Sequence, residues 1–177
     1  LHVGFSAPHS PIDPPQSYLD LYREHEETAA AGAGSPQQGA SQDGGRASRG
    51  KQDLDSRLAA ARKGYRALIS HIDAQVGRLV DAVRSRGELE NTVFIYTADH
   101  GEMAGDHGRD GKTCFYEGSM RIPLAIAGPG VKEGGATHAL GELLDLGKTT
   151  CELAGIPSHT LDQGKSIAPV LSGAASK

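Results

Sequence analysis

The longest regular pattern of apolar positions runs from Leu54 to Val83, where apolar residues recur at steps of three and four. This period places the apolar side chains on one face of a helix. Gly87 follows, at the point where a residue with left-handed backbone commonly ends a helix. The pattern therefore predicts one long amphipathic helix that stops just before Gly87.

Two short apolar runs come after this helix. Residues 92–98 are an almost continuous β-branched and aromatic run, which is typical of a strand buried on both faces. Residues 123–127 form a second apolar run, and Gly128-Pro129-Gly130 terminates it. Both runs predict strands. A last amphipathic helix is expected from Asp145 to Ala154, with Asp145 as its N-cap.

The amino-terminal third is less regular. Residues 2–6 alternate in polarity and predict a short strand, and one helical turn is expected near Tyr18–Tyr22. Residues 28–52 are mostly Ala, Gly, Ser and Gln without apolar periodicity, so we expect a disordered insertion there. The order of elements predicts an α/β fold with a mostly parallel sheet flanked by helices.

Composition excludes several classes of function. The chain has 177 residues and a formal net charge of −4, so no basic field favours nucleic acid as a partner. No apolar run approaches the roughly 18 residues that a membrane-spanning helix needs. Cys114 and Cys151 form no disulfide framework and lack metal-site spacing. Because neither an initiator Met nor a signal peptide is present, we expect the chain to begin within a fold, and its compartment cannot be read.

The candidate chemistry lies in the loop after the first buried strand, since ligands bind beyond the carboxyl ends of strands in open α/β sheets. Asp99 and His100 come first, and a carboxylate beside an imidazole suits a divalent cation. The alternative is a loop-capping Asp99 with His100 in a polar turn. Asp106, His107 and Lys112 follow in the same loop. Metal ligands with an ammonium group favour the hydrolysis of an anionic phosphate or sulfate ester.

This loop closely resembles the sulfatase family, over residues 96–108, Gly111-Lys112 and residues 116–123. The helix at 65–77 and the Pro8-His9-Ser10-Pro11 segment are also similar to the family. The resemblance implies that residues 1–177 are an incomplete sulfatase catalytic domain, its carboxyl-terminal part, with a partial alkaline-phosphatase-like fold.

The resemblance also implies roles for five residues. Asp99 and His100 would be ligands of a divalent metal, usually calcium, with Mg²⁺, Mn²⁺ and Zn²⁺ as alternatives; many members have Asn at the position of His100. Lys112 would contact the sulfate and the leaving-group oxygen. His9 would reach the sulfate and could protonate the leaving group, and His107 would contact the substrate or lie behind it.

Sulfatases use a formylglycine nucleophile made in a C-x-P-x-R or S-x-P-x-R segment, and this sequence contains no such segment. We therefore expect this chain alone to be inactive, although the family implies a sulfate-ester substrate and a secreted, periplasmic or lysosome-like compartment. Two alternatives remain. One is a phosphodiesterase or phosphonate monoester hydrolase of the same superfamily, and the other is a non-catalytic truncated product or binding paralogue.

Overall fold

A computed structural model describes residues 1–25, 46–157 and 163–174, and within 46–55 it describes the backbone alone. The chain divides into two compact units. The first comprises residues 1–79 and 100–121, and the second comprises residues 80–99 and 122–177.

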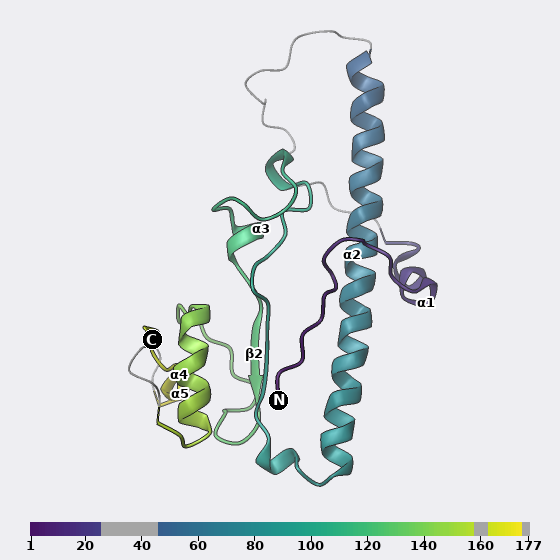
Figure 1. The fold of residues 1–177 in the computed structure, drawn as a ribbon. Coiled ribbons are helices and arrows are strands. Elements are labelled where there is room, and N and C mark those ends of the chain that lie inside the picture. The colour runs from purple at the N-terminus through teal and green to yellow at the C-terminus, as the bar shows by residue number, and fades with distance from the viewer. Residues whose placement is uncertain (26–45, 158–162, 175–177) are drawn as a thin grey trace. The chain divides into compact units, whose positions relative to one another are not determined.

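The dominant element is the helix α2 (Arg46–Ser85), which Figure 1 shows as one continuous rod. Its end matches the prediction from Gly87, which has a φ of 72°. The Glu88 N–H donates to Val83 O at 3.2 Å and the Gly87 N–H donates to Arg84 O at 3.0 Å. These two bonds form a Schellman motif, which satisfies carbonyls that the helix leaves unpaired.

The start of α2 differs from the prediction. Residues 46–52 belong to the helix, so this part of the expected insertion is helical; Arg, Lys and Gln there favour a helix even without an apolar stripe. Residues 28–45 of the expected insertion lie outside the described residues.

No helix in the described part of the chain is long and apolar enough to cross a membrane.

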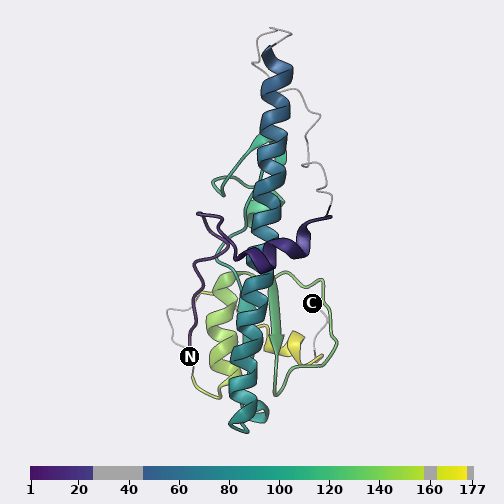
Figure 2. The same cartoon turned by 90° about the vertical axis from the view of Figure 1, so that its right-hand side faces the viewer.

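A short helical segment packs on α2, formed by α1 (Gln16–Leu19) and the 3₁₀ helix η1 (Asp20–Tyr22), as expected near Tyr18–Tyr22. Figure 2 shows it lying across α2. The Tyr22 hydroxyl is 2.7 Å from Ser70 Oγ, and the Tyr18 and His71 rings are 4.8 Å apart. These contacts fix the amino-terminal segment on the helix.

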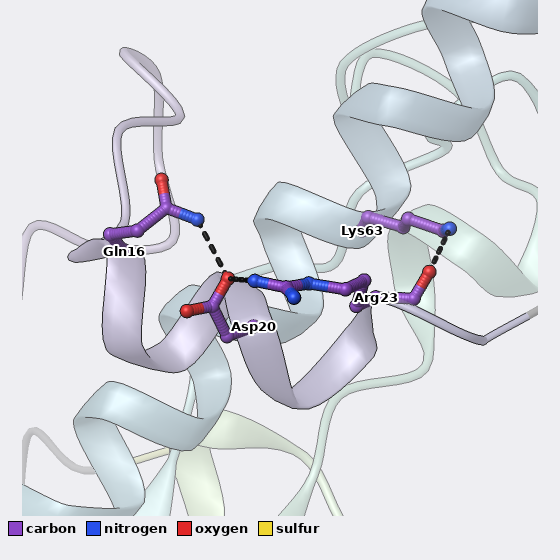
Figure 3. Close-up of polar contacts among 4 residues, drawn as sticks. All are labelled: Gln16, Asp20, Arg23 and Lys63. Atoms are coloured by element: carbon purple, nitrogen blue, oxygen red, sulfur yellow. Dashed lines mark hydrogen bonds and ion pairs between the residues drawn. The ribbon is translucent and has the colours of Figure 1, made fainter.

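An exposed polar cluster follows on the same segment (Figure 3). Gln16 Nε2 and Arg23 Nη2 donate to Asp20 Oδ1 at 2.8 and 2.9 Å, and Lys63 Nζ donates to Arg23 O at 3.5 Å. The hydrogen bonds from Gln16 and then Arg23 lower the pKa of the Asp20 carboxyl. All these partners are local or exposed, which is typical of a solvated helix end.

The sheet contains two described strands, β1 (Phe94–Thr97) and β2 (Leu124–Ala127), which pair antiparallel. The predicted parallel pairing is therefore wrong for these two strands. The chain leaves β1 and returns through a loop that contains no long crossover helix, whereas parallel neighbours need such a crossover. The α/β character of the fold is confirmed, and Phe94 pairs with Ala127 and Thr97 with Leu124.

Two further strand predictions need correction. Residues 2–6 form no strand in the described structure, and Leu1, Val3 and Phe5 are exposed. β1 is half-buried and not covered on both faces, because Tyr96 is 40% exposed. An apolar run shows that a strand suits a buried setting, but it does not supply the elements that would cover it.

The second unit also contains three helical elements. The 3₁₀ helix η2 (Leu89–Asn91) lies before β1, and α4 (Leu143–Leu153) and α5 (Ala168–Leu171) follow β2 in the chain. The N-cap of α4 is Glu142 and not Asp145, which occupies the third helical position. Asp145 Oδ2 accepts the Glu142 N–H at 2.9 Å, and Asp145 Oδ1 accepts the Lys165 N–H at 2.7 Å. The prediction placed the carboxylate at the right end of the helix but in the wrong capping position.

Candidate functional site

The loop between β1 and β2 carries four of the five predicted site residues: Asp99, His100, His107 and Lys112. It includes the 3₁₀ helix η3 (Asp106–Gly108) and the short α3 (Glu117–Met120). His100, His107 and Lys112 belong to the first unit, together with His9. Asp99 is the last residue of the 80–99 stretch of the second unit, directly before His100 in the chain.

The outgoing and returning arms of this loop are hydrogen-bonded to each other. The Gly101 N–H donates to Ser119 O and the Met103 N–H donates to Gly111 O, both at 2.8 Å. Met103 is 1% exposed and Ser119 is 3% exposed. A Cβ added to Gly101 would lie 2.1 Å from Gly118 O, so only glycine permits this approach of the two backbones.

The Glu102 carboxylate braces the inside of the loop. Its Oε1 accepts the Gly111 N–H at 2.6 Å and the Ala104 N–H at 3.1 Å. Because Lys112 follows Gly111 directly, this carboxylate helps to fix the backbone that carries the lysine. The Lys112 carbonyl accepts a hydrogen bond from the Cys114 N–H at 2.9 Å and another from the Ser119 hydroxyl.

The tip of the loop has an unusual backbone. Ala104, Gly105, His107 and Gly108 all have positive φ, with values of 45°, 90°, 54° and 66°. Arg62 of α2 reaches this tip: its Nε donates to Ala104 O at 2.7 Å and its Nη2 donates to Asp106 Oδ1 at 2.6 Å. The Arg62 guanidinium group therefore attaches the tip to the long helix.

His107 is exposed and lies against Tyr116. The two ring centroids are 4.1 Å apart and the ring planes differ by 11°, so the rings are stacked. This contact joins the tip of the loop to its returning arm, four residues after Lys112. The structure thus brings His107 next to an aromatic ring of the candidate site.

His100 and His9 are oriented in the same way. His100 Nδ1 lies 2.9 Å from Gly101 O, and His9 Nδ1 lies 2.9 Å from Ser10 O. A carbonyl oxygen can only accept, so Nδ1 donates in each case and the lone pair of the neutral ring is on Nε2. Metal-binding histidines commonly have this arrangement, with one nitrogen bonded to a carbonyl.

The donor set at Asp99 and His100 fits part of a metal site. Asp99 is exposed and supplies carboxylate oxygens, and His100 supplies the oriented imidazole. No group of three or more His, Cys, Asp or Glu side chains gathers around a metal position in residues 1–25, 56–157 and 163–174. Since a hard cation such as calcium takes about six to eight oxygen ligands, these two residues alone would supply only a fraction of a complete site.

His9 is the predicted residue that the described contacts do not join to the loop. It is exposed, and its hydrogen bonds are local, to Ser6 O through its N–H and to Ser10 O through its ring. A shallow hollow lies elsewhere in the same unit, lined by Asp20, Leu21, Arg23 and Glu24. It contains none of the predicted site residues, so we place no function in it.

Sequence reasoning missed Arg62 and the bracing role of Glu102. Glu102 lies within the motif that resembles the sulfatase loop, so its position next to His100 and Gly101 was a usable signal. Arg62 and Asp106 are 44 positions apart, and nothing in a single sequence pairs them. Arg121 Nη1 lies 3.6 Å from Glu117 Oε2 in the returning arm, with both side chains more than 80% exposed, where an ion pair contributes little.

Comparisons with known proteins identify the family of the chain. A family model described as Sulfatase matches residues 1–156. An arylsulfatase of Clostridium perfringens is 34% identical over 173 residues, which cover 94% of this chain and 36% of the relative.

Among solved structures, the yidJ protein of Bacteroides fragilis is similar with a TM-score of 0.78 at 25% identity, over 97% of this chain and 36% of that one. A phosphonate monoester hydrolase from Silicibacter pomeroyi has a TM-score of 0.64 at 33% identity, over 67% of this chain and 24% of that one.

These similarities define the class of the fold as the α/β fold of the sulfatases and of the alkaline phosphatase superfamily, of which this chain has a part. The chain belongs to the sulfatase family. Members of this family generally use a metal ion and a formylglycine. Nearly all of this chain aligns with the arylsulfatase and with a choline-sulfatase of Rhizobium meliloti, but it spans only about a third of the length of these relatives.

Proposed function

We propose that this chain contributes metal- and sulfate-binding residues to the hydrolysis of a sulfate ester. The observation that carries the proposal is the braced loop 100–121, which presents His100, His107 and Lys112 and follows Asp99 directly. Membership of the sulfatase family supports the choice of a sulfate ester. The arylsulfatase relative favours an aryl or similarly good leaving group as the first substrate to test.

The residues have separate proposed roles. Asp99 and His100 hold the metal, with Nε2 as the ligand atom of His100. The Lys112 ammonium contacts the sulfate and the leaving-group oxygen, where negative charge develops as the ester bond breaks. His9 contacts the sulfate and gives a proton to the leaving oxygen, and its Nδ1 bond to Ser10 O orients the ring. His107 contacts the substrate.

The metal and the nucleophile complete this site in a larger protein. When bound, the metal supplies positive charge that polarises the sulfate, and the formylglycine supplies the nucleophile. We propose calcium as the metal, as the family resemblance implies. The imidazole of His100 makes Mn²⁺ or Zn²⁺ the main alternative, because these ions bind nitrogen more readily than calcium does.

The test of the sulfatase proposal uses a full-domain protein, meaning this chain joined to a sulfatase segment that carries the formylglycine. Its initial rates of hydrolysis of matched aryl sulfate, aryl phosphate and phenyl phosphonate esters are measured over the same range of substrate concentrations. We expect the sulfate ester to give the highest kcat/KM. A higher value for the phosphonate would favour the second candidate, to which the Silicibacter pomeroyi structure is similar.

The metal is tested on the same full-domain protein after chelation. Ca²⁺, Mn²⁺ and Zn²⁺ are added back separately, and the melting temperature and activity are measured, because a ligand that binds only the folded state raises its stability. Calcium is expected to restore both. Restoration by Mn²⁺ or Zn²⁺ alone would replace calcium in the proposal.

A further inference from the structure

The tip of the loop is held in a conformation that its residues do not favour by themselves. Ala104 and His107 are the two non-glycine residues with positive φ among the described residues, at 45° and 54°. A Cβ disfavours this left-handed region, so such residues persist only where surrounding contacts hold them. The contacts that hold the tip therefore determine where the His107 ring lies.

Arg62 provides the central contact. Its guanidinium bonds to the Ala104 carbonyl and the Asp106 carboxylate at 2.7 and 2.6 Å, on either side of Gly105. Its side chain is 15% exposed, and that of Asp106 is 32% exposed, so solvent screens this ion pair less than a surface pair. A planar fork of donors suits these two acceptors, and a lysine ammonium does not reproduce it.

Leu58 supports the same contact from one helical turn earlier on α2. A Cβ added to Gly105 would lie 3.0 Å from both Leu58 Cδ atoms, which shows that the tip backbone lies directly on this side chain. Leu58 and Arg62 are four positions apart and share one face of the helix. One helical turn thus presents an apolar surface and a guanidinium to the tip.

Backbone hydrogen bonds within the tip fix the position of His107 relative to the residues that Arg62 contacts. The Gly108 N–H donates to Gly105 O at 3.1 Å and the Arg109 N–H donates to Asp106 O at 3.0 Å. The Gly105 N–H donates back to Arg109 O at 2.9 Å. His107 lies inside this closed set, and its ring stacks on Tyr116.

We propose that Arg62 is a positioning residue for the candidate site: it fixes the 104–108 backbone so that the His107 imidazole lies on Tyr116 and faces the substrate. The part that concerns the substrate rests on the proposed function. Arg62 itself touches no substrate in this proposal. It acts through the placement of His107.

The experiment uses the 177-residue chain and three variants, Arg62→Lys, Arg62→Ala and Arg78→Ala. Arg78 is the matched control, since it is an exposed arginine of the same helix whose Nη1 bonds only one turn away, to Gln75 Oε1. The readout is the NMR signal of the His107 Cε1 proton, which we expect the ring current of the stacked Tyr116 to shift upfield. Tyr116→Leu identifies this signal, and circular dichroism shows that each variant is folded.

We expect the upfield shift to disappear in Arg62→Lys, with the helical content retained, and to persist in Arg78→Ala. A retained shift in a folded Arg62→Lys or Arg62→Ala chain would overturn the proposal, because the ring would then be placed without the guanidinium. A loss of the shift in Arg78→Ala as well would also overturn it, since any change in α2 would then have the same effect.

Titration with inorganic sulfate separates this inference from the proposed function. In the unmodified chain we expect sulfate to shift the His107 signal, and in Arg62→Lys we expect the apparent Kd to rise about tenfold, as for the loss of one charge-assisted contact. If sulfate leaves the His107 signal of the unmodified chain unchanged, the role of His107 in the proposed function fails. The ring-current comparison still decides whether Arg62 places the ring.

Discussion

Single polar side chains in this chain often satisfy two backbone groups at once. Glu102 Oε1 accepts two N–H groups within the loop, and the two oxygens of Asp145 each accept one, from Glu142 and Lys165. A charged acceptor makes stronger bonds to N–H groups than a neutral one. The position of such a residue in a turn therefore determines the geometry of the residues around it.

At this scale, Lys112→Ala in the full-domain protein is expected to lower kcat for an aryl sulfate by about a hundredfold or more, as removal of a preorganised charge contact commonly does. Lys148→Ala is the control, because Lys148 lies in α4 of the second unit and not in the loop that carries the candidate site. An unchanged kcat in Lys112→Ala would remove Lys112 from the site.

Asp145 gives a prediction about stability and pH. The backbone N–H groups of Lys165 and then Glu142 lower the pKa of its carboxyl below the ordinary value of 3.8. The carboxylate therefore stabilises the fold at any pH above the unfolded value, and this contribution is lost as the pH falls through the lower folded value. Asp145→Asn is expected to reduce the free energy of unfolding by about 1 kcal/mol at pH 7.

Urea unfolding at pH 7 and at pH 3 measures this difference. The gap between the unmodified chain and Asp145→Asn should narrow at the lower pH, because protonation removes the charge that distinguishes the two. Asp73→Asn, at an exposed position of α2, should show no such gap. A gap that widens at pH 3 would contradict the assigned pKa direction.

At the scale of elements, the glycines of this chain differ in how closely other atoms approach them. Gly101 lies against Gly118 O, where a Cβ would be 2.1 Å away. Gly77 lies inside α2, and a Cβ there would meet nothing within 4 Å. The same substitution should thus have opposite effects at the two positions.

Gly101→Ala is expected to destabilise the chain by about 2 kcal/mol or more, since the two arms of the loop must move apart. Gly77→Ala is expected to stabilise it by roughly 0.5–1 kcal/mol, because alanine is the better helix former. Thermal unfolding followed by circular dichroism measures both. A stabilised Gly101→Ala variant would show that the arms are not in close contact.

Elements that depend on local signals were predictable from the sequence. The end of α2 at Gly87, the end of β2 at Gly128 and the strand near Ile95 all follow from patterns within a few residues. The antiparallel pairing of β1 and β2 was not predictable in this way, because it depends on the path of the chain between them. The capping position of Asp145 was missed since Glu142 is a weaker N-cap signal than Asp.

The same distinction between local and distant signals applies to the candidate site. Asp99, His100, His107 and Lys112 were found because they lie close together in one motif. The attachment of the loop to α2 was not found, because the Arg62 and Asp106 side chains are distant in the sequence. Whether His9 joins the loop residues is a prediction that the described contacts leave untested.

At the scale of the whole molecule, the chain covers 36% of the Clostridium perfringens arylsulfatase, and no Cys or Ser in it begins an x-P-x-R segment. The 177-residue chain alone is therefore expected to show no turnover of an aryl sulfate, whereas the full-domain protein is active. Product release is measured for both at equal concentration, with a full-domain variant lacking the nucleophile as background. Hydrolysis by the 177-residue chain above this background would contradict the expectation.

The ladder between β1 and β2 has a consequence for how this protein can vary. Thr97 and Leu124 are paired across the two strands, so residues 98–123 form a loop whose two ends lie side by side. Insertions or deletions in such a loop leave the pairing of the strands intact, whereas a one-residue change inside a strand would turn its side chains to the opposite face. The length and the side chains of this loop can therefore change in evolution while the pairing of β1 with β2 is kept.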